Sequence, residues 1–129
     1  LVSNNDKNKI DIKRSPEIIY GLRNFIGNAI KFSKQKVQVE LISDERNLSI
    51  NILDDGPGFP EDIIKILGEP YIKSKSKEIS NKAGLGLGTF LGKTLLERQG
   101  AKLSFFNKST ESGAFVKIDW GIKSLISAS

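Results

Sequence analysis

Residues 54–58 read DDGPG and residues 84–88 read GLGLG, and the interpretation of the whole chain starts from these two glycine-rich stretches. Each lies where one predicted element ends and another begins. Both follow a predicted helix whose polar stripe carries Asn24, Asn28 and Lys31. Together these residues can hold a purine at one end and a magnesium triphosphate at the other. The sequence therefore predicts an ATP-binding module.

The composition matches an ordinary globular domain. Of the 129 residues, 38% are hydrophobic and 27% are charged, which suffices for one core. No apolar stretch approaches the roughly 20 residues of a membrane-spanning helix. The absence of Cys excludes disulfides and thiolate metal sites within the chain, and the absence of Met and His predicts a fragment of a longer protein. We expect a polar lead-in at residues 1–8, the domain at 9–121 and a C-terminal tail at 122–129.

Apolar side chains at three- and four-residue spacing, Ile18, Leu22, Phe25, Ile26 and Ala29, predict a helix at residues 16–33. We expect a short helix at about 61–67 and a second long helix at about 89–99. Pro16 suits the first turn of the first helix, and Gly100 suits the C-cap of the third. At about 100° per residue, Asn24, Asn28 and Lys31 fall within an arc of about 60° on a face away from the apolar stripe. These three side chains can therefore act as one polar surface.

Alternating apolar and polar residues predict strands at residues 37–41, 48–52, 102–106 and 115–120, with a weak further edge strand at 9–12. Helices that bury one face each, beside strands that alternate, fit an α/β (α+β) two-layer sandwich. We expect a mixed, mostly antiparallel sheet of about five strands, covered on one face by three helices.

The second glycine stretch, Gly84, Leu85, Gly86, Leu87 and Gly88, leads directly into the third helix. Taken alone, it fits a structural turn and a phosphate loop equally well. In this context, free backbone N–H groups and the positive end of the helix dipole favour an anion. A dinucleotide-binding loop would need a strand directly before it. The Walker pattern of a lysine followed by Ser or Thr is missing too, because Thr89 and Phe90 follow the last glycine.

Asp54 ends a predicted strand beside Gly56 and Gly58. A carboxylate there can accept a hydrogen bond from the exocyclic amine of adenine, which a purine bearing a carbonyl could not donate. Such a contact would select ATP over GTP. Taken alone, an Asp followed by Gly and Pro is more simply a turn-forming residue.

Asn28 offers a neutral oxygen ligand to Mg²⁺, which takes few protein ligands and completes its octahedron with water and phosphate oxygens. Lys31, one turn further on, can neutralise phosphate charge. Taken alone, both side chains are ordinary solvated residues of a helix face. The ATP-binding interpretation depends on the helix, the aspartate and the two glycine stretches occurring together.

The net charge of +5 raises the possibility of a nucleic-acid partner. Four of the basic residues, however, share one serine-rich segment that contains no aromatic residue: Lys73, Lys75, Lys77 and Lys82. Platforms on which bases could stack are missing there, so we expect no nucleic-acid partner. A solvated loop and a lid that brings lysines near phosphates are compatible interpretations of this segment.

The sequence resembles a known family. Residues 22–33, LRNFIGNAIKFS, resemble the N box of sensor histidine kinases, and residues 54–58 and 84–88 resemble their first and second glycine boxes. The resemblance spans about residues 10–120. GEPY at residues 68–71 and TLLERQGA at 94–101 are most similar to redox-responsive RegB-type kinases.

The resemblance implies the Bergerat ATP-binding fold shared with gyrase, Hsp90 and MutL, with ATP and Mg²⁺ as ligands. It implies that Asp54 recognises adenine, that Asn28 binds the metal, that Asn24 and Lys31 line the phosphates, and that residues 72–83 form the lid. The nucleotide-binding residues that we expect are Asn24, Asn28, Lys31, Asp54, Gly56, Gly58, Tyr71, Lys73, Gly84, Leu85, Gly86, Leu87 and Gly88.

Three departures qualify this expectation. ATP-hydrolysing relatives carry a glutamate four residues before the magnesium ligand, whereas this chain has Asn24, which is not a general base, so we expect slow hydrolysis. Many relatives carry a Thr after the glycine that precedes the last strand; here Gly113 is followed by Ala114, and a water or backbone group would have to serve. With no His, the chain lacks the phosphoacceptor.

We therefore expect the catalytic, ATP-binding domain of a two-component sensor histidine kinase, with no catalytic residue of its own. It would present Mg-ATP to a histidine on a separate dimerisation domain, with a response regulator receiver domain downstream. We expect a cytoplasmic domain without direct membrane contact, in a parent protein attached to the inner membrane. The alternatives are an ATP-hydrolysing clamp and a degenerate interaction module that binds no nucleotide; a nucleic-acid-binding role ranks behind both.

Overall fold

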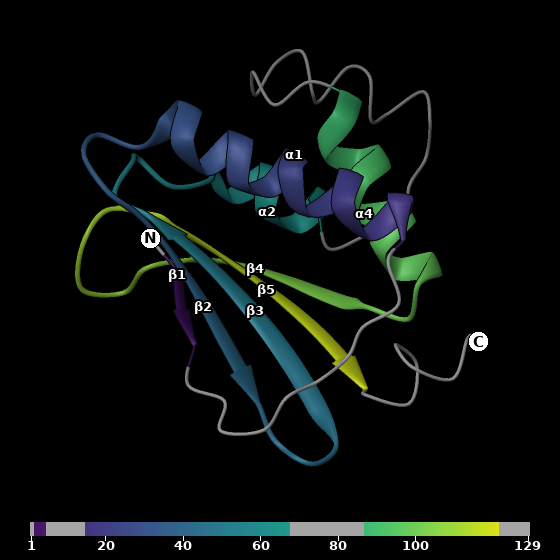
Figure 1. Cartoon of the computed structure of the whole chain (residues 1–129). Helices are drawn as coiled ribbons and strands as arrows, with labels where there is room; N and C mark the ends of the chain where they lie inside the picture. Colours follow the sequence, from purple (N-terminus) through teal and green to yellow (C-terminus); the bar gives the residue numbers. More distant parts are fainter. Residues whose placement is uncertain (1, 5–14, 68–86, 122–129) are drawn as a thin grey trace.

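The structure, a computed structural model, describes residues 2–4, 15–67 and 87–121. Within these residues, five strands form a sheet in the order β1-β2-β3-β5-β4, and three helices cover one of its faces (Figure 1). The strands are β1 (Val2–Asn4), β2 (Val37–Ser43), β3 (Asn47–Asp54), β4 (Lys102–Asn107) and β5 (Ala114–Gly121). The helices are α1 (Pro16–Phe32), α2 (Glu61–Leu67) and α4 (Leu87–Arg98). The predicted two-layer α/β sandwich is confirmed.

The edge strand β1 differs from the prediction. Val2–Asn4 pairs in parallel with β2, Val2 lying opposite Val39, and the other neighbouring strands pair antiparallel. The stretch 1–8, expected as a polar lead-in, therefore contributes a strand, while the predicted strand at residues 9–12 lies outside the described residues. Three residues are too few to show an alternating pattern, so sequence periodicity could not detect β1.

The core lies between the sheet and the helices. Alternate residues of the neighbouring strands β3 and β5 point toward the helices. In the register of the two strands, Ile52 lies opposite Val116 and Ile50 lies opposite Ile118. Trp120, at the end of the same row, is buried. Among the described residues, no helix is long and apolar enough to cross a membrane.

Helix α1 begins as its sequence predicts. The Ser15 hydroxyl accepts a hydrogen bond from the Ile18 N–H at 3.4 Å, and Pro16 occupies the first turn. Helix α4 begins at Leu87, two residues before the predicted start, so the end of the GLGLG stretch lies in its first turn. Glycine propensity is a weak guide to a helix boundary, and tertiary packing overrides it here.

Helices α1 and α4 pack closely at two glycines. A Cβ atom on Gly21 would lie 2.7 Å from Leu96 Cδ1, and a Cβ atom on Gly92 would lie 3.3 Å from Gly21 Cα. Leu96 is fully buried, so it has no room to move aside. The absence of side chains at these two positions therefore lets the middle of α4 approach the N-terminal half of α1.

Candidate functional site

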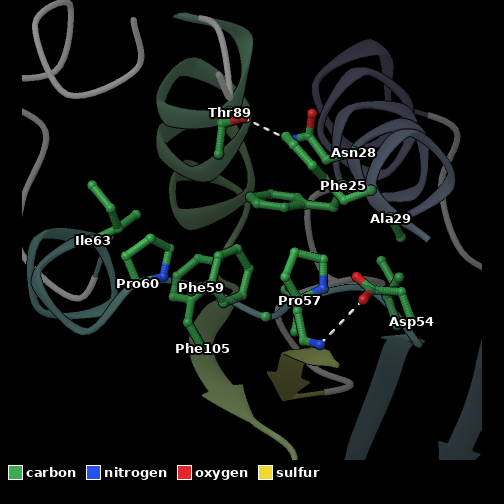
Figure 2. A pocket seen from close by; sticks show the side chains of 15 residues that line it. Phe25, Asn28, Ala29, Asp54, Pro57, Phe59, Pro60, Ile63, Thr89 and Phe105 are labelled. Carbon is green, nitrogen blue, oxygen red and sulfur yellow. Dashed lines mark hydrogen bonds between the residues drawn. The ribbon is translucent and has the colours of Figure 1, made fainter. Parts of the chain in front are cut away.

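A cavity of about 360 Å³ opens between α1, the end of β3 and the start of α4 (Figure 2). Its walls are mostly apolar and are formed by Phe25, Ala29, Phe32, Ile52, Pro57, Gly58, Phe59, Pro60, Ile63, Phe105, Ala114 and Val116. Its polar lining residues are Asn28, Asp54 and Thr89. An apolar cavity of this size with a few convergent polar groups suits a small, largely planar organic ligand.

Asp54 is the last residue of β3 and is only 6% exposed. Its Oδ1 accepts hydrogen bonds from the backbone N–H groups of Gly56, at 2.8 Å, and Ala114, at 3.2 Å. Among the residues that the structure describes, both hydrogen bonds to this carboxylate end on Oδ1. Oδ2 therefore remains to accept a hydrogen bond from a ligand.

The β4–β5 turn holds the loop that follows Asp54. Asn107 donates from Nδ2 to the Phe59 carbonyl at 2.8 Å and accepts at Oδ1 from the Phe59 N–H at 2.7 Å. The Ser112 hydroxyl donates to the Gly56 carbonyl at 2.6 Å. Gly58 has a positive φ of 83°, and a Cβ atom there would lie 2.6 Å from Asn107 Oδ1, so only glycine suits this position.

Asp55 holds the other side of the loop. Its carboxylate accepts hydrogen bonds from the backbone N–H groups of Lys34, at 2.7 Å, and Gln35, at 3.1 Å, just beyond the end of α1. Partial desolvation raises the pKa of Asp55, but these N–H donors outweigh it and leave the pKa below its ordinary value. The ionised carboxylate therefore ties the loop to the connection between α1 and β2.

Asn28 lies at the other end of the cavity in Figure 2, on α1. Its Nδ2 donates to the Thr89 hydroxyl at 2.6 Å, and in Figure 2 its oxygen points away from that contact. Asn28 also borders a second, shallower hollow, to which Asn24 contributes. Among the described residues, no three His, Cys, Asp or Glu side chains gather as a metal site. A metal ion here would therefore rely on Asn28 Oδ1 and on oxygens of the ligand.

Comparison with known proteins places this geometry in a family. Residues 14–122 match the family described as histidine kinase-, DNA gyrase B-, and HSP90-like ATPase. The chain belongs to this family. The resemblance to RegB-type kinases is confirmed as well, because the sensor histidine kinase RegB of Cereibacter sphaeroides is 37% identical over 94% of this chain and 29% of RegB.

Other members of the histidine kinase-like ATPase family agree with this assignment. The sensor protein kinase PilS of Pseudomonas aeruginosa is 33% identical over 73% of this chain and 18% of its own length. The chain thus spans less than a third of the length of these relatives. The catalytic domain of histidine kinase ThkA superposes with a TM-score of 0.69 over 93% of this chain and 76% of its own, and at 17% identity it shows the fold.

The structure brings together several of the residues predicted for this ATPase-family site. Asn28, Asp54 and Gly58 line the main cavity, and Gly56 supports Asp54. Asn24 follows along α1 in the neighbouring hollow. Lys31 lines neither; its Nζ lies 5.3 Å from the centroid of the Phe32 ring.

The remaining predicted residues belong to the segment before α4. Leu87 and Gly88 lie in the first turn of α4. Tyr71, Lys73, Gly84, Leu85, Gly86 and the proposed lid at 72–83 lie outside the described residues. Their roles in nucleotide binding stay predictions, as do those of the residues that line the cavity.

Sequence reasoning did not identify the aromatic walls or Thr89 as parts of the site. Phe25 lies on the apolar stripe of the helix predicted at 16–33, and Phe105 lies within the strand predicted at 102–106. Periodicity shows that such residues are buried, but not that they border a cavity. Thr89 becomes visible as a site residue only once α1 and α4 are placed together.

Proposed function

We propose that this chain is the ATP-binding catalytic domain of a sensor histidine kinase. It holds Mg-ATP so that the γ-phosphoryl group passes to a histidine on a separate dimerisation domain and from there to a response regulator receiver domain. The observation that carries this proposal is the pairing of the Asp54 carboxylate and the Asn28 amide in one apolar cavity. Family membership and the named relatives support it.

The adenine ring occupies the apolar part of the cavity in this proposal. Phe25, Ile52 and Phe105 provide walls that exclude water from the ring. Asp54 Oδ2 accepts the hydrogen bond of the exocyclic amine, while the two backbone N–H groups on Oδ1 keep the carboxylate in place. A guanine ring presents a carbonyl to the same oxygen and leaves Oδ2 without a donor, so ATP is preferred over GTP.

The phosphates lie toward Asn28 and the start of α4. Asn28 Oδ1 is the protein ligand for Mg²⁺, and the N-terminal end of α4 favours negative charge. Asn24 and Lys31 add polar and positive groups along α1. When bound, Mg²⁺ neutralises phosphate charge as the phosphoryl group is transferred, a reaction in which proteins act mainly by positioning and electrostatics.

Asn24 lies where a hydrolytic enzyme needs a base. Its carboxamide donates to the Tyr20 carbonyl at 3.4 Å, and an amide cannot take a proton from water. This favours a domain that retains ATP until a histidine is presented over an ATP-hydrolysing clamp. We place the domain in the cytoplasm, in a parent protein attached to the inner membrane, by analogy with the sensor kinases that it matches.

Asp54→Asn tests the adenine contact. The Asn oxygen can keep the two backbone donors, so its Nδ2 faces the adenine amine and sets one donor against another. We expect ATP affinity, measured by calorimetry, to fall about 10- to 100-fold, in line with about 1–3 kcal/mol for an unsatisfied buried group.

Asp44→Asn is the matched control. Asp44 also accepts two backbone N–H groups, from Arg46 and Asn47, in the turn between β2 and β3. It does not line the cavity. ATP affinity is expected to stay within about twofold of the parent for this variant. Parent-like ATP binding by Asp54→Asn would show that Asp54 does not recognise adenine.

A further inference from the structure

We propose that Thr89 is a positioning residue for the metal site. Its hydroxyl accepts a hydrogen bond from Nδ2 of Asn28 and thereby leaves Oδ1 of the same carboxamide facing away from Thr89, where it would bind the metal ion. The inference rests on the proposed function, in which Asn28 is the protein ligand of Mg²⁺. It adds a residue that acts on the metal through Asn28 without touching the metal.

The contact joins two helices that are far apart in sequence. Asn28 Nδ2 on α1 and Thr89 Oγ1 on α4 are 2.6 Å apart and are separated by 61 positions. Thr89 is 2% exposed, so water does not compete for its hydroxyl as it would at the surface. Figure 2 shows the two side chains facing each other, with the amide nitrogen of Asn28 directed at Thr89 and the oxygen directed away.

An Asn ligand needs such a partner because its two ends differ chemically. The oxygen can bind Mg²⁺, whereas the NH₂ group has no lone pair to offer and would direct its hydrogens at the cation. Rotation of the amide by half a turn exchanges the two ends. A fixed acceptor on the nitrogen side selects the productive orientation before the metal arrives, as outer-shell partners do for other metal ligands.

Thr89 can select an orientation because its own position is fixed. It lies in the first turn of α4, followed by the buried Phe90. Helices α1 and α4 pack closely at Gly21 and Gly92, and the fully buried Leu96 fills the space beside Gly21. The acceptor is therefore carried by a rigid helix, which is the arrangement that holds a ligand to a precise geometry.

A simpler interpretation is that Thr89 only fills space between the helices. The two interpretations differ for Thr89→Val, which keeps the branched shape and removes the acceptor. If Thr89 only packs, the variant changes stability and leaves the metal response unaltered. If Thr89 positions Asn28, the variant weakens the magnesium-dependent part of nucleotide binding and spares the metal-independent part.

The experiment measures ATP affinity of the 129-residue chain by calorimetry, once with Mg²⁺ and once with EDTA, and takes the ratio of the two affinities. Thr89→Val is expected to lower this ratio about tenfold, within the range for loss of an outer-shell partner. Thr89→Ser keeps the hydroxyl and is expected to retain the parent ratio within about twofold. Asn28→Ala gives the affinity ratio that remains when the side chain that binds Mg²⁺ is removed.

Thr94→Val is the matched control on the same helix. The Thr94 hydroxyl donates to the Phe90 carbonyl at 3.0 Å within α4, and Thr94 is not among the residues that line the cavity. The same substitution there is expected to leave the ratio unchanged. An unchanged ratio in Thr89→Val, or an equal loss in Thr89→Ser, overturns the inference.

Two further outcomes are separable. If ATP binding by the parent chain shows no magnesium dependence, both the proposed function and this inference are contradicted. If the parent depends on magnesium and Thr89→Val has the parent's affinity ratio, this inference alone is contradicted.

If Thr89→Val does not fold, NMR of the parent chain tests the inference instead. The Nδ2 hydrogens of Asn28 are expected to exchange slowly with solvent before and after Mg-ATP is added, and exchange at the rate of an exposed amide would contradict the inference.

Discussion

Asp54 and Asp55 are adjacent in sequence and hold opposite sides of one loop. The Asp54 carboxylate faces the cavity and is held by the N–H groups of Gly56 and Ala114. The Asp55 carboxylate accepts from the backbone just beyond α1 instead. Successive side chains at a strand end point to opposite sides, so Asp54 lines the cavity while Asp55 holds the backbone beyond α1.

Asp55→Asn tests that scaffold role through pH. The folded pKa of Asp55 is lowered from 3.8, so its contribution to stability is fully present above that value and is lost as the pH falls through the lower folded pKa. The parent is therefore expected to melt at a higher temperature than Asp55→Asn at pH 7, and the gap is expected to narrow below about pH 3.8. Thermal melts of both proteins between pH 7 and pH 2.5 measure it. A gap that is constant with pH would contradict the role of the ionised carboxylate.

At this scale the sequence predicted the residues that belong to local motifs. Asp54 and Gly58 lie in one short loop, and Asn28 lies on a helix face that periodicity defines, so each was identified without coordinates. Asn107 and Thr89 were not, because their contacts, with Phe59 and Asn28, cross 48 and 61 positions of the chain. Only tertiary structure brings such pairs together.

Among the elements, the α1–α4 pair has the most direct effect on the site. The two helices approach at Gly21 and Gly92, and this approach brings Thr89 to Asn28. Helix α2 contributes Ile63 to the cavity lining, and the β4–β5 turn holds the loop after β3 through Ser112. The site is thus formed where separate elements meet, and the packing of α1 on α4 sets the distance between Asn28 and Thr89.

Gly21→Ala and Gly27→Ala form a matched pair on α1. A methyl group at Gly21 meets the buried side chain of Leu96, so we expect overpacking to lower the free energy of unfolding by about 1–3 kcal/mol. A methyl group at Gly27 meets nothing within 4 Å. The better helix propensity of Ala is therefore expected to raise the free energy of unfolding by about 0.5–1 kcal/mol. Urea unfolding measures both. Equal effects at the two positions would contradict the close packing of the helices.

Sequence periodicity predicted the elements well where they are long. The bounds of α1 and α4 agree with the prediction to within two residues. Helix α1 carries a regular apolar stripe, and Gly100 marks the end of α4. The strand Val2–Asn4 was missed because its place in the sheet depends on pairing with β2, and no local pattern marks it.

For the whole molecule, sheet order explains where the cavity lies. β3 and β5 are neighbours at the centre of the sheet, so the end of β3 at Asp54 and the start of β5 at Ala114 come together under the helices. The antiparallel pairing also places the β4–β5 turn beside the loop after β3. Residues from several distant parts of the chain thereby surround one volume.

In the proposed function, this site is one part of a larger system. The chain spans less than a third of the relatives it matches and contains no histidine. In the proposed function, binding and transfer are therefore divided between domains, and this domain retains nucleotide until its partner arrives. Slow ATP hydrolysis is then necessary, because hydrolysis would remove the γ-phosphoryl group before it could be transferred to the histidine.

The most direct test of this account is a calorimetric titration of the 129-residue chain with ATP in the presence of Mg²⁺. The account predicts a saturable one-to-one isotherm with no heat continuing after each injection. Continuing heat would mean turnover and would favour an ATP-hydrolysing clamp. The absence of binding heat, confirmed by a second binding method, would contradict the central claim and indicate a degenerate interaction module.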